Sequence, residues 1–229
     1  MLSLGIDSSA VTASCALVRD SNVLAFTSVT NKMTHSETLM PMVASLFKIV
    51  SVDPDELDYI SVSGGPGSFT GLRIGISTVK GLAFKKPLPC VNVSTLEALA
   101  YNLIDCRNVI ICPCMDARRG EFYNALFESC DGELKRLTDD RAITGDLLRS
   151  ELSDKKVIVC GDGAIKFTEC FMPEARIASP TVRLQNAASV ALLGEKYFRS
   201  GKSDHPENLV PFYIRPSGGE RKKEQGSFS

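Results

Sequence analysis

This chain of 229 residues has few histidines and no closely paired cysteines of the Cys-x-x-Cys type. Each of these features argues against a kind of metal or disulfide site. Only two histidines occur, His35 and His205, which argues against a metal site built from several histidines of one chain. The eight cysteines are scattered, and no Cys-x-x-Cys occurs. Free thiols therefore fit better than disulfides or zinc, with Cys112-Pro-Cys114 as a weak exception.

An excess of charge and a long apolar run are also absent. Lys plus Arg is 26 against 27 for Asp plus Glu, so the composition gives no excess of positive charge for binding nucleic acid. If RNA is involved, we expect a partner to hold it. The start of the chain lacks the basic region of a secretory leader, and no segment approaches the length of a membrane span. We expect a cytoplasmic protein without membrane contact.

The most informative stretch runs from residue 59 to residue 84. An alternating β-branched run leads into the glycine-rich turn 64–71, and apolar residues then recur at helical spacing up to residue 84. Ser68 or Thr70 can cap this helix, whose start is a natural anion site. No lysine follows as in a Walker loop, so spacing alone favours a tight strand-to-helix connection while a phosphate contact stays open.

Two other turns allow the same pair of interpretations. The first strand ends in Asp7-Ser8-Ser9, which can hold magnesium or phosphate or can simply close a turn, and Gly161-Asp-Gly163 precedes a later helix. The weak candidates for phosphate or nucleotide contact are Asp7, Ser8, Ser9, Gly65, Gly67, Gly161 and Gly163. Arg118-Arg119 lies in a charged turn and can grip phosphate or a carboxylate, or pair with Asp116 and Glu121.

Two helices of the first half are unusual on one face. The predicted helix 35–50, with Thr34 and Glu37 placed for a capping box, has an apolar face wider than one side of a sheet requires. In the helix that follows the glycine turn, small residues recur four or three positions apart at Gly71, Gly75 and Thr78. Another element of the same chain can fill such a groove, and so can a second chain.

Alternating elements predict an α/β protein with mixed sheets flanked by helices. A three-strand meander at 2–7, 11–18 and 23–30 opens the chain. We expect an N-terminal lobe over residues 1–104, a C-terminal lobe over 105–216, and a polar, disordered tail over 217–229. Within the second lobe we expect strands at 108–115, 121–127 and 133–138, a helix at 184–199 and a last extended segment at 209–214.

Five segments spread along the chain resemble the bacterial TsaB (YeaZ) family. They are Gly5-Ile-Asp7-Ser-Ser9, His35-Ser-Glu37-Thr-Leu39-Met-Pro41, Gly64-Gly-Pro-Gly67-Ser-Phe69-Thr-Gly71-Leu-Arg73, Asp116-Ala-Arg118-Arg-Gly120-Glu121 and Pro211-Phe-Tyr-Ile-Arg215. The third segment is the most specific. The resemblance implies an actin/sugar-kinase/Hsp70-like (ASKHA, RNase H-like) fold with two lobes, the second degenerate.

For function, the resemblance implies a scaffold and no catalysis. The family's paralogue TsaD binds its metal with a His-x-x-x-His pair, and the corresponding stretch 94–99 here contains no histidine. The expected role is a non-catalytic dimerisation subunit of the complex that transfers a threonylcarbamoyl group to N6 of adenosine 37 in tRNAs reading codons that begin with A (t6A synthesis). The alternative is an ASKHA-type small-molecule phosphotransferase or ATPase.

The resemblance also implies partners and a surface for them. TsaD, the ATPase TsaE and tRNA are the expected partners, with a homodimer when the chain is alone. No cofactor is expected on this chain, whereas ATP with magnesium and a metal ion are expected on partner subunits. The expected interface residues are His35, Leu39, Met42, Val43, Leu46, Gly71, Leu72, Gly75, Thr78 and Val79.

Overall fold

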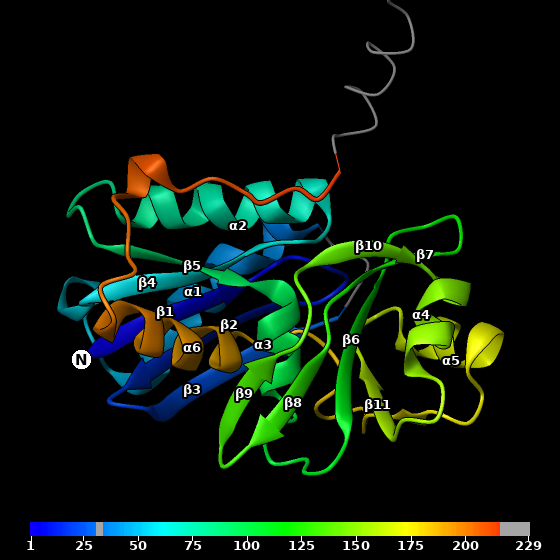
Figure 1. The fold of residues 1–229 in the computed structure, drawn as a ribbon. Helices are drawn as coiled ribbons and strands as arrows, with labels where there is room; N and C mark the ends of the chain where they lie inside the picture. Colours follow the sequence, from blue (N-terminus) through cyan, green and yellow to red (C-terminus); the bar gives the residue numbers. More distant parts are fainter. Residues whose placement is uncertain (31–33, 216–229) are drawn as a thin grey trace, which may run out of the picture.

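Two β-sheets lie side by side in the protein, with helices outside and between them (Figure 1). The structure is a computed structural model, and it describes residues 1–30 and 34–215. The predicted tail, 217–229, lies outside the described residues. The arrangement confirms the predicted α/β class with mixed sheets flanked by helices.

The first sheet contains five strands in the order β3-β2-β1-β4-β5. These are β1 (Leu2–Asp7), β2 (Ala13–Arg19), β3 (Asn22–Val29), β4 (Tyr59–Gly65) and β5 (Cys90–Ser94). The first three strands are antiparallel neighbours, which confirms the predicted meander, and β4 and β5 add to it in parallel. The carboxyl ends of β1, β4 and β5 therefore meet at one edge of the sheet.

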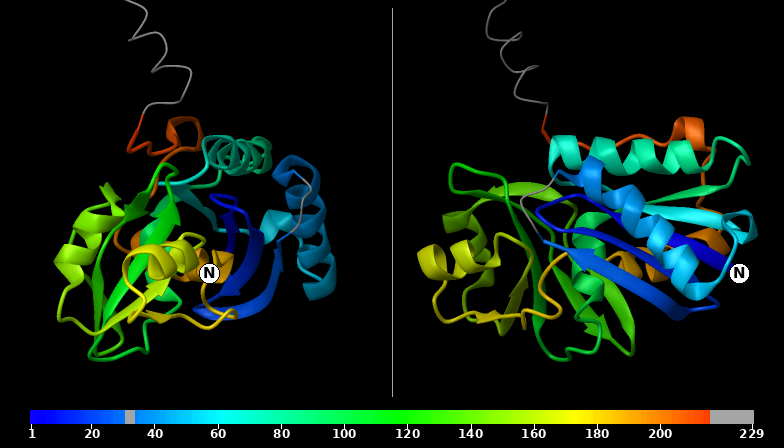
Figure 2. Two further views of the ribbon diagram at one scale, coloured as in Figure 1. Left: turned by 90° about the vertical axis from the view of Figure 1, so that its right-hand side faces the viewer. Right: turned by 180° about the vertical axis from the view of Figure 1, so that it is seen from behind.

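Helices cover both faces of this sheet, as the two further views show (Figure 2). The helices α1 (His35–Val50) and α2 (Phe69–Leu82) cover one face, where Leu2, Leu4 and Ile6 of β1 enter their core. The opposite face packs against α3 (Thr95–Tyr101) and α6 (Ala187–Arg199). At Gly5 a Cβ atom would lie 2.3 Å from the carbonyl oxygen of Ala187, so only glycine allows α6 to lie this close to β1.

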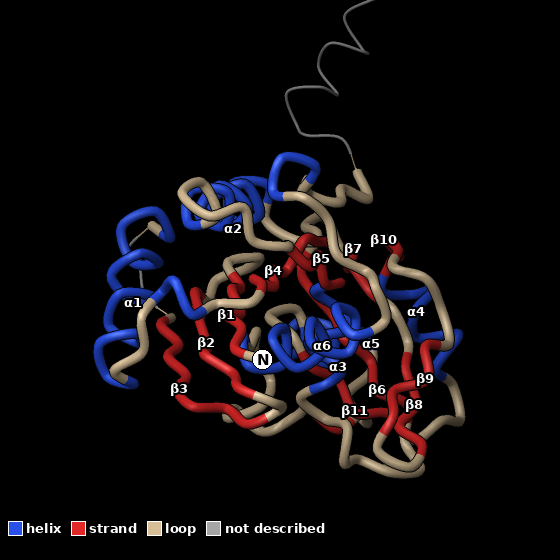
Figure 3. The backbone as a smooth tube through the Cα atoms, turned by 90° about the vertical axis from the view of Figure 1, so that its left-hand side faces the viewer, coloured by secondary structure: helices blue, strands red, loops and turns tan. Residues whose placement is uncertain are grey.

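The second sheet follows the order β10-β7-β6-β11-β12, with β8 paired with β6 and β9 paired with β8. Its strands are β6 (Ile110–Asp116), β7 (Glu121–Asn124), β8 (Phe127–Cys130), β9 (Glu133–Arg136), β10 (Arg141–Thr144), β11 (Val157–Cys160) and β12 (Arg176–Ile177). On its outer face lie α4 (Gly145–Leu152) and α5 (Ala164–Phe171), where the rings of Phe122, Phe167 and Phe171 pack together. On the inner face, α3 packs between the two sheets (Figure 3).

Helix starts follow the predicted caps. The Glu37 carboxylate accepts hydrogen bonds from the Thr34 backbone nitrogen (3.1 Å) and hydroxyl (2.8 Å), as expected for a capping box. At α2 the cap is Ser68, whose hydroxyl accepts a hydrogen bond from the Gly71 backbone nitrogen. The short turns η1 (Pro54–Glu56) and η2 (Pro206–Asn208) complete the described elements.

Three predicted segments of the second half differ from the structure. The predicted strand 121–127 is divided between two strands, β7 and β8. The chain turns at Ala125-Leu126, where the Leu126 carbonyl oxygen accepts a hydrogen bond from the Leu137 backbone nitrogen. The helix predicted from residue 184 begins at Ala187 and packs on the first sheet. Residues 209–214 are extended but join no sheet. The division at residue 104 stays a prediction.

Candidate functional site

A cleft of about 580 Å³ lies where the carboxyl-end loops of the two sheets face each other. One wall consists of Ser9 to Val11 and Pro66 to Thr70, and the other of Met115 to Arg118, Tyr123 and Asp162. The C-terminal segment Phe212 to Arg215 closes one side. Proteins with open α/β sheets bind ligands at this edge, so the cleft is the first candidate site.

Asp7, the predicted magnesium or phosphate residue, is fully buried beside this cleft. Its carboxylate accepts hydrogen bonds from the Ser9 backbone nitrogen (2.9 Å), the Ser9 hydroxyl (2.7 Å) and the Ser63 hydroxyl. Burial raises the pKa of Asp7, an effect that these hydrogen bonds oppose. The group closes a turn, and it does not fit a magnesium ion, which needs accessible carboxylate oxygens.

The glycine-rich turns are filled by the chain itself. A Cβ atom at Gly67 would lie 2.4 Å from the Ser9 carbonyl oxygen, and one at Gly65 would lie 2.2 Å from that of Phe212. In the second sheet, Gly161 and Gly163 each lie against the Cys114 carbonyl, which accepts the Gly163 backbone nitrogen at 2.9 Å. These close approaches favour the tight-connection interpretation of both turns over a phosphate contact.

The C-terminal segment binds both sheets at the edge of the cleft. The Phe212 backbone nitrogen donates to the Gly64 carbonyl (2.7 Å), and Tyr213 stacks on Phe69 with ring centres 4.8 Å apart. Arg215 reaches Glu121 of the second sheet at 2.5 Å. The predicted motif Pro211 to Arg215 therefore acts as a clasp between the sheets.

Asp162 lines the cleft, although the sequence analysis mentioned it only as the middle residue of the turn Gly161-Asp-Gly163. Burial, with a further contribution from the nearby Asp116, raises the pKa of Asp162 to about 6. The Asp116 carboxylate is itself paired with Lys166 at 2.9 Å. The cleft is thus lined by the half-buried Asp162, by the exposed Asp116 with its Lys166 partner, and by the exposed Arg118 at its rim.

Most of the predicted interface residues are buried in the chain's own core. Leu39, Met42, Val43 and Leu46 of α1 belong to the core of the first sheet, where α1 packs against β2 and β3, because the face they share is the one turned to the sheet. Among the small residues of α2, Gly71 and Gly75 accommodate Ser8: their Cβ atoms would lie 2.1 Å and 2.6 Å from its oxygens.

Leu72 and Val79 are buried as well, and only His35 and Thr78 of the predicted set are partly exposed. His35 is fixed by a 2.6 Å hydrogen bond between its Nε2 and the Ala10 carbonyl. The inference that the apolar face of α1 and the small-residue face of α2 lie outside the core was therefore wrong. A partner surface on these helices stays a prediction, and it would involve the faces turned away from the sheet.

Those outer faces form a groove of about 700 Å³ between α1 and α2. Its apolar part comes from Met40 of α1 and from Phe69, Ile74 and Leu82 of α2, and Gly81 leaves it open because nothing lies within 4 Å of its would-be Cβ atom. Met40 is 45% exposed. An apolar groove between two helices fits an apolar helix of another chain.

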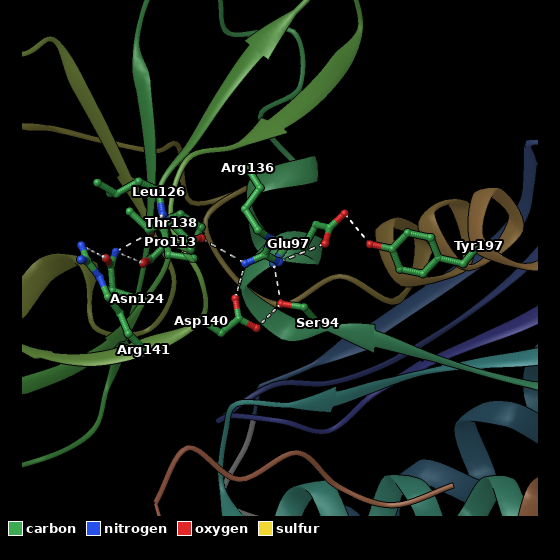
Figure 4. A network of polar contacts seen from close by, with 11 residues as sticks. Ser94, Glu97, Pro113, Asn124, Leu126, Arg136, Thr138, Asp140, Arg141 and Tyr197 are labelled. Atoms are coloured by element: carbon green, nitrogen blue, oxygen red, sulfur yellow. Dashed lines mark hydrogen bonds and ion pairs between the residues drawn. The ribbon is translucent and has the colours of Figure 1, made fainter. Parts of the chain in front are cut away.

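The stretch 94–99, where the resemblance puts a histidine pair in TsaD, forms an ion network instead (Figure 4). The Arg136 guanidinium binds Glu97 of α3 at 3.0 Å and Asp140 at 2.5 Å. Ser94 donates to Asp140 (2.6 Å), and Tyr197 of α6 donates to Glu97 (2.6 Å). The network joins α3, α6 and the β9–β10 region. Sequence reasoning missed Arg136, whose partner Glu97 on α3 lies 39 residues away in the chain.

No metal-binding group is found in the part of the chain that the structure describes, where no three His, Cys, Asp or Glu side chains gather as ligands would. In residues 1–30 and 34–215, no helix is long and apolar enough to cross a membrane.

Comparison with known proteins gives three consistent findings. Residues 29–223 match the family model described as "TsaD: tRNA N6-adenosine threonylcarbamoyltransferase". The chain is 33% identical to TsaB of Escherichia coli (strain K12) over 93% of this chain and 94% of that protein. It is 38% identical to TsaB of Bacillus subtilis (strain 168) over 62% of each chain.

Solved structures agree with the sequence relatives. YeaZ from Pseudomonas aeruginosa has a TM-score of 0.80 and 25% identity, covering 93% of this chain and 99% of that one. The ethanolamine utilization protein EutJ from Carboxydothermus hydrogenoformans, with a TM-score of 0.55 and 12% identity over 85% and 90% of the two chains, shares the fold alone.

The two sheets with a cleft at their carboxyl edge define an ASKHA-type α/β protein, as predicted. At Asp7 and at the glycine turns, internal contacts occupy the positions that the sequence left open for phosphate or magnesium. Within that class, the chain belongs to the TsaB (YeaZ) family.

Proposed function

We propose that this chain is an accessory subunit in the synthesis of t6A in tRNA, and that it supports a catalytic TsaD subunit without performing the transfer itself. The curated relatives are named as tRNA threonylcarbamoyladenosine biosynthesis proteins. The observation that carries the scaffold role is the open apolar groove between α1 and α2, combined with a phosphate region filled by the chain's own residues.

The groove supports docking by helices. Met40, Phe69 and Ile74 present apolar surface there that the chain's own sheet does not cover. Burying such side chains yields about 25 cal/mol per Å², so two helices packed into the groove add to the stability of a complex. The equivalent outer faces of TsaD helices are the proposed partner, and a second copy of this chain takes their place when TsaD is absent.

The remaining partners follow from this assignment. TsaE and tRNA join through the assembled complex in the cytoplasm, and ATP with magnesium and the catalytic metal bind the partner subunits. The fully buried Asp7 supports the absence of a magnesium nucleotide on this chain, since its oxygens are engaged by Ser9 and Ser63.

The docking surface is tested by charge in the groove. Met40→Glu and Gly81→Glu place a carboxylate where no core contact is lost, and each should abolish copurification with TsaD while circular dichroism and melting temperature stay unchanged. The matched control is Ile49→Glu, because Ile49 lies on the same α1, is 72% exposed and does not line the groove. Full capture of TsaD by both groove variants would disprove this surface.

The accessory role is tested by reconstitution. Purified TsaD, TsaE and tRNA should form t6A only when this chain is added, and the isolated chain should neither bind nor hydrolyse Mg-ATP in calorimetry. Micromolar binding with turnover by the isolated chain would instead identify a phosphotransferase or ATPase.

A further inference from the structure

The turn between β6 and β7 holds two arginines in an unfavourable backbone conformation. Arg118 and Arg119 have φ of +66° and +55°. The other non-glycine residues with positive φ in the described chain are Asp20, Ser21, Ser51, Asn108, Asp131 and Asp154. Short polar side chains of this kind tolerate the left-handed region, whereas long side chains rarely occur there. The sequence therefore keeps two arginines at this turn against conformational preference.

Their guanidinium groups are left without partners in the described residues, where neither makes an ion pair or a side-chain hydrogen bond. The sequence left open that they pair with Asp116 and Glu121. In the structure Asp116 is paired with Lys166 at 2.9 Å and Glu121 with Arg215 at 2.5 Å. Two exposed cationic groups thus stand free in this turn, Arg118 at the rim of the cleft and Arg119 next to it in the chain.

The cleft beneath them has walls suited to an aromatic ring. The ring of Tyr213 lies on one side, supported by Phe69, whose ring also carries the Arg73 guanidinium, and Tyr123 lies on the other side. The carboxyl of Asp162 lines the interior and can accept hydrogen bonds from amino or imino groups. Cations at the rim, with aromatic rings and a carboxyl inside, match a ligand with a phosphate at one end and a nucleobase at the other.

We propose that this cleft receives an unpaired nucleotide of the RNA substrate, with its phosphodiester on Arg118 and Arg119 and its base between the aromatic walls. The inference rests on the proposed function, which brings an RNA to the complex. RNA-binding proteins commonly take bases from single-stranded loops and stack them on aromatic side chains.

The charge pattern favours a phosphodiester of RNA over the polyphosphate of a free nucleotide. The carboxyl of Asp162, which lines the cleft, repels a chain of phosphates, and the backbone nitrogens of Ser68 and Gly163 already donate to the carbonyl oxygens of Ser9 and Cys114. Among the described residues that line the cleft, the unpaired cation is Arg118 at the rim. A single phosphate at the rim with the base directed inward satisfies both conditions.

The test uses the assembled complex and a variant that relieves the turn. Arg118→Asn combined with Arg119→Gly removes both guanidinium groups and introduces residues that adopt positive φ readily, so the fold is retained. We expect its affinity for tRNA to fall at least about tenfold, as loss of charge-assisted hydrogen bonds implies. The dependence of log affinity on log salt should become shallower by about 1.

The matched control is Arg149→Ala with Arg176→Ala, which removes the same charge from two exposed arginines that do not line the cleft and should leave both quantities unchanged. Capture of TsaD by the Asn-Gly variant is measured in parallel and should be normal, which separates this inference from the docking function. Unchanged tRNA affinity and salt slope would overturn it. Binding of free AMP or ATP that disappears in the variant, with tRNA affinity unchanged, would overturn it as well.

Discussion

Two glycines of the same helix should respond in opposite ways to alanine. At Gly75 the new Cβ atom would lie 2.6 Å from the Ser8 hydroxyl oxygen, which donates a buried 2.8 Å hydrogen bond to the Gly71 carbonyl. At Gly81 nothing lies within 4 Å of the same atom. Since both positions are in α2, the comparison separates packing from helix propensity.

The magnitudes follow from these contacts. Alanine gains up to about 1 kcal/mol over glycine within a helix, and less near its end, so Gly81→Ala should stabilise the fold by some tenths of a kcal/mol. At Gly75 the same gain is opposed by displacement of Ser8, which costs about 1–3 kcal/mol for a broken buried hydrogen bond and a similar amount for overpacking. We expect Gly75→Ala to destabilise the fold by about 1–3 kcal/mol.

Urea unfolding followed by circular dichroism measures both differences, with Gly81→Ala as the internal control. A Gly75→Ala protein as stable as Gly81→Ala would refute the conclusion that Ser8 fills this groove. It would restore the possibility that the groove belongs to a second chain. The same reasoning predicts that a charged residue at Gly75 unfolds the chain, so it cannot serve as a probe of docking.

Two further predictions concern titratable groups. The pKa of Asp162 is about 6 in the folded state and 3.8 ordinarily, so the folded state binds more protons between these pH values. The free energy of unfolding should therefore fall by up to about 3 kcal/mol from this group as pH rises through this range. Asp162→Asn should remove this fall in urea midpoints measured from pH 4 to 7, and a constant difference between variant and parent across that range would contradict the assignment. Burial raises the pKa of Cys15 to about 12 and that of Cys160 well above its usual range. Ellman's reagent at pH 8 should therefore label the exposed Cys130 and Cys170 rapidly, and should label Cys15 and Cys160 only after unfolding. Rapid labelling of Cys15 or Cys160 in the native protein would show that the core opens.

Local patterns predicted the elements of the first half well. The helix at residues 35–50, its capping box at Thr34 and Glu37, and the strand, glycine turn and helix after residue 59 are all present, since each depends on neighbours within a few residues. The sequence could not decide which face of a helix meets the sheet when both faces carry apolar or small residues. Hence the core face of α1 was predicted to be a docking surface.

Long-range contacts account for what sequence reasoning missed. Tyr213 reaches Arg73 across 140 residues, and Ser94 reaches Asp140 across 46. No periodicity marks such pairs, because they depend on where the fold places each segment. The two arginines of the β6–β7 turn were identified from sequence. Only the structure shows that the nearby acids pair with other cations, Asp116 with Lys166 and Glu121 with Arg215.

The clasp made by the last described segment has a consequence for folding during synthesis on the ribosome. The first sheet is completed only by late residues: α6 lies on β1 and β2, Asp204 pairs with Cys90 of β5, and Phe212 bonds to Gly64. Domains commonly fold as they leave the ribosome, amino end first. Here the face of the first sheet that α6 covers stays open until residues 187–212 have been synthesised, so chaperones that shield nascent chains have a long opportunity to bind that face.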